Sequence, residues 1–226
     1  GDTISAIPHP DINDSALLGR NSNLGLGWRR LSIIDLSPTG HQPMSNADQS
    51  IWIVFNGEIY NYIELRKDLA AKGFVFRTQS DTEAIVHAYS AWGQDCVHHL
   101  NGMWSFALYD ALNKRLFCSR DRFGIKPFYY YWDGTTFRFA SEIKALLESD
   151  EIPRRANSAM VYDYLTHRIL DHTDQTFFES IVQLRPGHSL QLDLSGLRTR
   201  EYYTLEFNPE LGHFDENEAH RFADEF

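Results

Sequence analysis

The residues best suited to chemistry in this sequence stand at the end of one apolar run. Residues 51–55 favour β-structure, and Asn56 and Gly57 follow them directly. We expect a buried strand that ends in a turn here, because Asn-Gly tolerates left-handed backbone angles and lets the backbone approach a ligand. An Asn amide beside an exposed backbone N–H is a pair of donors for a developing oxyanion. The alternative is that Asn-Gly serves only as a turn.

Charged groups nearby in the sequence could complete a binding site. Arg29 and Arg30 precede a predicted short strand at residues 31–34. Either both are surface residues, or one turns into a pocket, where a guanidinium group binds a carboxylate through two hydrogen bonds. Asp81 lies in a capping box that runs from Ser80 to Glu83 and predicts the start of a helix, where a carboxylate is stabilised. Asp81 either supports the helix alone or also holds an ammonium group.

The elements that must position these groups fall into separate helical and extended parts. Helical patterns run from residue 59 to 72 and from Ser80 to Gly93, with a short strand expected at 74–78 between them. Hairpins follow at 103–119, 128–140 and 188–205, and helices are expected at 142–147 and after Asn157. Strands that follow one another without helices between them pair antiparallel, so the sequence predicts an α+β layered sandwich.

Composition excludes several classes of protein. The formal net charge of −10 over 226 residues argues against a nucleic-acid partner, which needs a basic face. No apolar run approaches the ~18 residues of a membrane span, and no signal peptide is recognisable, so we expect a cytoplasmic protein without membrane contact. Cys96 and Cys118 are expected to be free, buried thiols. The ten histidines lack metal-ligand spacing, so no metal site is predicted.

Six runs of residues, in order along nearly the whole chain, resemble the glutaminase domain of glutamine-hydrolysing asparagine synthetases. They are Arg-Leu-Ser-Ile-Ile-Asp at 30–35, Gly-His-Gln-Pro-Met at 40–44, Phe-Asn-Gly-Glu-Ile-Tyr-Asn at 55–61, Ser-Asp-Thr-Glu at 80–83, Leu-Asn-Gly-Met at 100–103 and Arg-Asp-Arg-Phe-Gly-Ile-Lys-Pro at 120–127. Matches of this length, in this order, make the resemblance specific.

The resemblance implies a fold and a function. The fold is that of a class II glutamine amidotransferase of the N-terminal-nucleophile (Ntn) hydrolase type, a four-layer αββα sandwich of two antiparallel sheets. We expect this domain at residues 1–206 with its N-terminus missing, and a linker or the start of an ATP-dependent synthetase domain at 207–226. The function implied is hydrolysis of L-glutamine to glutamate and ammonia, for ATP-dependent amidation of L-aspartate to L-asparagine. No cofactor is expected in this domain; ATP and Mg²⁺ would bind the synthetase domain, and a homodimer is possible.

The resemblance also assigns roles to individual residues. Arg30 corresponds to the residue that binds the α-carboxylate of glutamine, and Asp81 to the one that receives its α-ammonium group. Asn56 and Gly57 correspond to the oxyanion hole, and Glu58 to a neighbour that lines the same pocket. The remaining pocket wall is assigned to the backbone around Leu31, Ile33 and Ile34.

The sequence departs from the family pattern at its start. The family nucleophile is an N-terminal cysteine whose own α-amine acts as base, and Gly1 offers an amine without a thiol. We therefore expect these 226 residues alone not to release ammonia. Either the sequence is truncated, or the nucleophile was lost and the domain remains as a scaffold or glutamine-binding module. Trp28 stands where the family usually has histidine, and the sequence does not determine how its larger indole ring changes the local packing. A further alternative is that the ammonia goes to an acceptor other than aspartate, either a sugar or another carboxylate.

Overall fold

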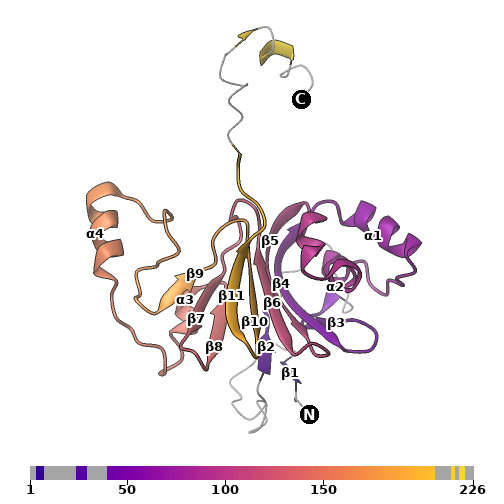
Figure 1. Ribbon diagram of the computed structural model, residues 1–226, viewed down its shortest axis with the longest axis horizontal. Helices are drawn as coiled ribbons and strands as arrows, with labels where there is room; N and C mark the ends of the chain where they lie inside the picture. Colours follow the sequence, from indigo (N-terminus) through magenta and orange to yellow (C-terminus); the bar gives the residue numbers. More distant parts are fainter. Residues whose placement is uncertain (1–3, 8–23, 30–39, 207–214, 217–218, 222–226) are drawn as a thin grey trace.

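The computed structural model describes residues 4–7, 24–29, 40–206, 215–216 and 219–221, which form three sheets (Figure 1). A six-stranded antiparallel sheet, in the order β11-β10-β6-β5-β4-β3, contains β3 (Met44–Ser45), β4 (Ile51–Ile59), β5 (Gly102–Asp110), β6 (Arg115–Arg120), β10 (His188–Asp193) and β11 (Gly196–Glu201). A three-stranded antiparallel sheet contains β7 (Tyr129–Trp132), β8 (Phe137–Ala140) and β9 (Ile181–Gln183). A separate pair, β1 (Ile4–Ile7) and β2 (Leu24–Gly27), is parallel.

Helices cover the outer faces of the two larger sheets, which confirms the predicted αββα class (Figure 1). Helices α1 (Tyr62–Ala71) and α2 (Asp81–Trp92), followed by a 3₁₀ turn at Gly93–His98, pack on the six-stranded sheet around the largest apolar cluster. A second cluster, which includes Val54 and Phe128, lies between the sheets. Helix α3 (Ile143–Leu146) packs on the three-stranded sheet, whereas α4 (Ser158–His167) buries only Met160.

Strand β4 runs through the whole Asn56-Gly57 segment, so the predicted turn at that point is wrong. Residues 51–59 pair with β5 in unbroken register, with Asn56 opposite Ser105 and Gly57 opposite Trp104. A Cβ atom on Gly57 would lie 2.2 Å from the backbone oxygen of Met103. Glycine is therefore required here because β5 approaches closely, not because the chain turns. The first helix accordingly begins at Tyr62, three residues later than expected.

The predicted strand at residues 74–78 is also wrong, although the helix after it is correct. Ser80 caps α2 by accepting a hydrogen bond from the Thr82 N–H at 3.2 Å, as expected. The Glu83 carboxylate accepts the N–H groups of Arg77 and Thr78 at 2.8 and 2.7 Å. Because this side chain takes the backbone donors that a neighbouring strand would need, the segment stays irregular.

The remaining predicted elements agree with the structure where it describes them. The three hairpins form as β5–β6, β7–β8 and β10–β11, and Asn157 caps α4 with its side-chain oxygen. The predicted strand at 31–34 and most of the segment at 207–226 lie outside the described residues. Cys96 and Cys118 are free and buried. Within the described ranges, the helices are all too short or too polar to cross a membrane.

Candidate functional site

Among the described residues, one edge of β4 has an unoccupied backbone N–H group that lies between two N–H groups with hydrogen-bond acceptors. The Phe55 N–H donates to Oε1 of Gln42 at 2.6 Å, and the Ile59 N–H donates to Oδ2 of Asp81 at 3.0 Å. Residues two apart in a strand point their N–H groups the same way, so the Gly57 N–H faces this edge as well. No described hydrogen bond uses it. The edge thus offers one N–H group to a ligand.

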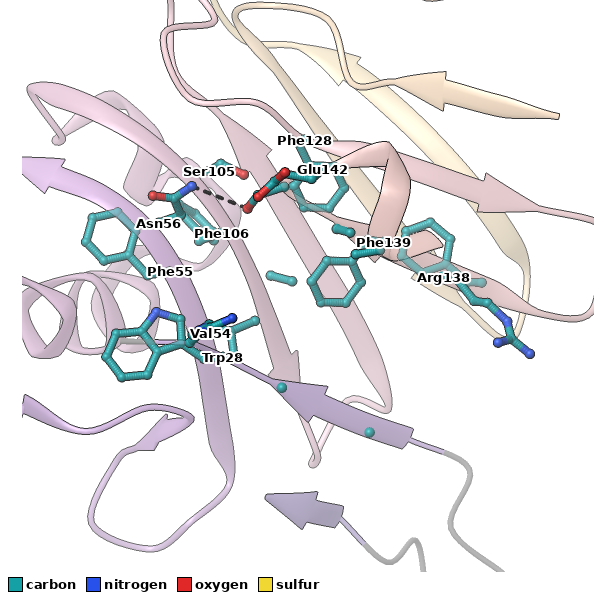
Figure 2. Close-up of a pocket in the computed structure, with 18 residues that line it drawn as sticks. Trp28, Val54, Phe55, Asn56, Ser105, Phe106, Phe128, Arg138, Phe139 and Glu142 are labelled. Atoms are coloured by element: carbon teal, nitrogen blue, oxygen red, sulfur yellow. Dashed lines mark hydrogen bonds between the residues drawn. The ribbon is translucent and has the colours of Figure 1, made fainter. Parts of the chain in front are cut away.

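The Asn56 side chain rises from one face of the sheet, into a cavity between the two sheets (Figure 2). Its Nδ2 donates to the Ser141 hydroxyl at 3.3 Å, across the cavity from β4. The cavity has a volume of about 520 Å³, within the ~300–1,000 Å³ usual for small-molecule sites. Aromatic rings form much of its wall, among them Phe128, Phe137 and Phe139. Because Asn56 Nδ2 carries two N–H bonds, one remains for a ligand while the other bonds to Ser141.

Asp81 begins α2 on the helical side of the same strand. Its side chain is buried, with the residue only 6% exposed, and it accepts the Ile59 N–H. Burial raises the pKa of the Asp81 carboxyl, and nearby Glu58 raises it further, while backbone N–H groups partly oppose the change. A buried carboxylate in this state is stabilised by a neighbouring cation. An ammonium group is therefore a fitting ligand for Asp81.

The structure brings half of the predicted site residues together. Asn56, Gly57 and Glu58 are consecutive in β4, and Asp81 binds the next residue of that strand. Asn56 lines the cavity between the sheets, whereas Gly57, Glu58 and Asp81 are not among the residues that line it. The other predicted residues, Arg30, Leu31, Ile33 and Ile34, lie outside the described part of the chain.

Three further polar residues adjoin the site, and the sequence analysis did not predict them. Gln42 occupies the edge of β4, Ser141 holds the Asn56 amide, and Ser105 lies opposite Asn56 and lines the cavity. Only Gln42 had a signal, because it belongs to the matched run at 40–44. Trp28, noted for replacing a histidine, packs against the apolar cluster between the sheets and lines the cavity.

Neither cysteine of the sequence can act as a nucleophile at this site. Burial raises the pKa of the Cys96 thiol, and it raises that of Cys118 well above its ordinary value. The thiolate is the reactive form of cysteine, so both side chains are inert near neutral pH. What the described residues do provide is a strand edge with one open backbone N–H, the neighbouring Asn56 amide and the Asp81 carboxylate.

Comparisons with known proteins identify the family and the fold of the chain. Residues 5–203 match the family model described as a glutamine amidotransferase domain. "Asparagine synthetase [glutamine-hydrolyzing] 3" of Bacillus subtilis is 36% identical over 209 residues, which cover 92% of this chain and 34% of that protein. "Putative asparagine synthetase [glutamine-hydrolyzing] 2" of Methanocaldococcus jannaschii is 38% identical over 220 residues, covering 89% of this chain and 42% of that protein. The chain thus spans less than half of either relative.

Solved structures share the fold at low sequence identity. The glutamine phosphoribosylpyrophosphate amidotransferase of B. subtilis, complexed with ADP and GMP, is 17% identical with a TM-score of 0.52. The match covers 73% of this chain and 32% of that one. A structure described as the allosteric regulatory enzyme of purine biosynthesis is 18% identical, also with a TM-score of 0.52, and covers 74% of this chain and 32% of its own. From the match over residues 5–203, the chain belongs to the glutamine amidotransferase domain family.

Proposed function

We propose that this chain binds L-glutamine at the open edge of β4 and forms the glutaminase part of a glutamine-dependent asparagine synthetase. The observation that carries the proposal is the Gly57 N–H, which no hydrogen bond among the described residues uses, between the occupied donors of Phe55 and Ile59 and adjacent to the Asn56 amide. Two donors on neighbouring residues, one backbone N–H and one side-chain amide, suit the oxygen of a carboxamide that is being attacked. Family membership and the names of the two relatives support glutamine as the substrate.

The two ends of glutamine are handled by different groups. The Asp81 carboxylate receives the α-ammonium group, which offsets the cost of burying that carboxylate. Arg30 binds the α-carboxylate, and Glu58 adds to the negative potential around the ammonium group. The side-chain amide then lies over Asn56 and Gly57, whose N–H groups stabilise the tetrahedral oxyanion by about 2.7–4 kcal/mol per donor.

The covalent step needs a thiolate that these residues do not supply, since both cysteines are buried with raised pKa values. In the complete reaction, the thiolate of an N-terminal cysteine attacks the amide carbon and its α-amine takes up the thiol proton. The protonated α-amine then gives its proton to the departing nitrogen, ammonia leaves, and water hydrolyses the γ-glutamyl thioester to glutamate and the free thiol. The synthetase domain, which would bind ATP and Mg²⁺, uses the ammonia to convert aspartate to asparagine.

Calorimetric titration of the 226-residue chain with glutamine tests the binding claim. L-Glutamine should bind with one site per chain, D-glutamine should not, and the Asp81→Asn variant should bind much more weakly. A folded chain without affinity for L-glutamine would refute the proposal. The same preparation should release no ammonia from glutamine, and a measurable rate would disprove the inference that the thiol comes from elsewhere.

The two alternatives make different predictions for the protein that its gene encodes. A scaffold without a nucleophile would bind glutamine but never hydrolyse it. An amidotransferase for a sugar or another carboxylate would hydrolyse glutamine, but adding aspartate and ATP would give no asparagine. Sedimentation of the same protein tests whether it forms a homodimer.

A further inference from the structure

Gln42 belongs to a matched run of residues for which the proposed mechanism has no use. Its side chain is buried, with the residue 4% exposed, and both ends of its carboxamide are engaged. Oε1 accepts the Phe55 N–H at 2.6 Å, and Nε2 donates to the Thr82 hydroxyl at 3.4 Å. Phe55 directly precedes Asn56, and Thr82 directly follows Asp81. One buried amide therefore joins the neighbours of two site residues.

The chemistry of this link calls for a carboxamide. The Phe55 N–H needs an acceptor, and leaving a buried N–H unpaired costs about 1–3 kcal/mol. Glutamine supplies that acceptor and a donor for Thr82 from one side chain. A glutamate would add a further buried carboxylate near Asp81, where burial already disfavours the charged form. A hydrocarbon would provide neither bond.

Gln42 also defines where the open edge of β4 begins. Ile53 pairs with Met44 of β3, the next outward N–H at Phe55 is taken by Gln42, and the one at Ile59 is taken by Asp81. The Gly57 N–H lies between the last two. Loss of the two Gln42 hydrogen bonds would shift Phe55 relative to the start of α2. Asn56 would then shift relative to Asp81, because these two residues are next to Phe55 and Thr82.

We propose that Gln42 is a positioning residue for the glutamine site, which fixes the spacing between the oxyanion donors on β4 and the carboxylate at the start of α2. This role rests on the proposed function and goes beyond it. Gln42 does not line the cavity, and it acts through Phe55 and Thr82. Oxyanion donors act only at about 2.7–3.1 Å from the developing charge, so a small displacement affects the rate more than the binding of substrate.

The test uses the protein as its gene encodes it, with ammonia release from glutamine as the assay. Gln42→Met keeps the length of the side chain and removes both hydrogen bonds, and Thr82→Val removes the weaker bond alone. Gln183→Met is the matched control, because Gln183 is also buried, donates to the Thr173 backbone oxygen at 2.8 Å and accepts from Arg120 at 3.2 Å. Gln183 lies in β9 of the other sheet, away from the open edge.

Gln42→Met should lower kcat about tenfold or more while KM changes less than about threefold. Thr82→Val should lower kcat by a smaller factor, and the double variant should be no slower than Gln42→Met alone, because the two residues form one link. Gln183→Met should lower the unfolding temperature by a similar amount and leave kcat within about twofold.

An unchanged kcat in folded Gln42→Met, or an equal loss of kcat in Gln183→Met, would overturn the positioning role while leaving the proposed function intact. If Gln42→Met does not fold, Thr82→Val decides, and a wild-type kcat in that variant overturns the role. A wild-type protein that neither binds nor hydrolyses glutamine would overturn the proposed function, and the role of Gln42 with it.

Discussion

Replacing Asn56 by alanine separates the proposed catalytic role of this residue from its part in packing. Within the described part of the chain, its Nδ2 makes one hydrogen bond, to Ser141 at 3.3 Å, on the wall of the cavity between the sheets. The other N–H of that nitrogen is available to the oxyanion. Asn56→Ala removes both, whereas Ser141→Ala removes only the bond between the two side chains.

The expected magnitudes differ for rate and stability. Loss of one oxyanion donor costs about 2.7–4 kcal/mol in the transition state, or roughly 10²–10³ in kcat. The bond to Ser141 is long and partly buried, so its loss should cost no more than about 1 kcal/mol of folding free energy. Asn56→Ala should therefore lower kcat by at least about a hundredfold while the free energy of unfolding changes little.

The assay is steady-state ammonia release by the protein as its gene encodes it, with urea unfolding of each variant in parallel. KM for glutamine should stay close to that of the wild type, since the donor acts mainly in the transition state. Ser141→Ala should keep most of the rate because it leaves the Asn56 donor in place. Equal losses of kcat in the two variants, or unchanged turnover in Asn56→Ala, would refute the reasoning.

Three further changes test the surroundings of the site. Burial raises the pKa of Asp81, so its ionisation lowers the stability of the fold as pH rises through that pKa. Asp81→Asn should therefore raise stability at neutral pH, and it should weaken glutamine binding because the negative charge is lost. A variant that is less stable than the wild type at pH 7 would contradict this. For Glu83, burial opposes ionisation, but His87 and the N–H groups of Arg77 and Thr78 prevail and lower the pKa to about 2. Ionised Glu83 stabilises the fold by about 3 kcal/mol above its ordinary pKa of 4.5, and this stabilisation is lost as pH falls towards 2. In Glu83→Gln, the free energy of unfolding measured by circular dichroism should therefore depend less on pH over that range. Gly57→Ala should destabilise by about 2–3 kcal/mol in urea unfolding, since its Cβ would meet the Met103 backbone oxygen at 2.2 Å, and a cost below about 0.5 kcal/mol would contradict the close approach of β5.

Local patterns in the sequence predicted those elements whose cause is local. The hairpin at 103–119 has alternating residues around a turn, and Ser80 caps α2 through Thr82, two residues away. The two wrong elements depend on distant partners. Asn56-Gly57 is a good turn sequence, but β5 pairs with it from more than forty residues further along the chain. The segment at 74–78 lacks a strand because Glu83 takes its backbone donors.

The candidate site could be predicted only in part for the same reason. Asn56, Gly57 and Asp81 were singled out from the strand-turn pattern and the capping box, the resemblance to a family then assigned their roles, and those roles stay predictions until variants are measured. Ser141 meets Asn56 across 85 residues of sequence, and Gln42 meets Thr82 across 40. Nothing in the composition around Ser141 distinguishes it from an ordinary loop serine. Such pairs become visible only when the sheets are assembled.

Under the proposed function, the Gly57 N–H on β4 gives a physical reason for the recognition of a carboxamide. A side-chain amide has the same donor and acceptor as a peptide unit, so glutamine can complete one missing rung of a β-ladder. Gln42 and Asp81 already complete the rungs on either side with groups borrowed from side chains. A single rung is too short for a foreign strand to pair along, so the edge admits a small amide while resisting edge-to-edge aggregation.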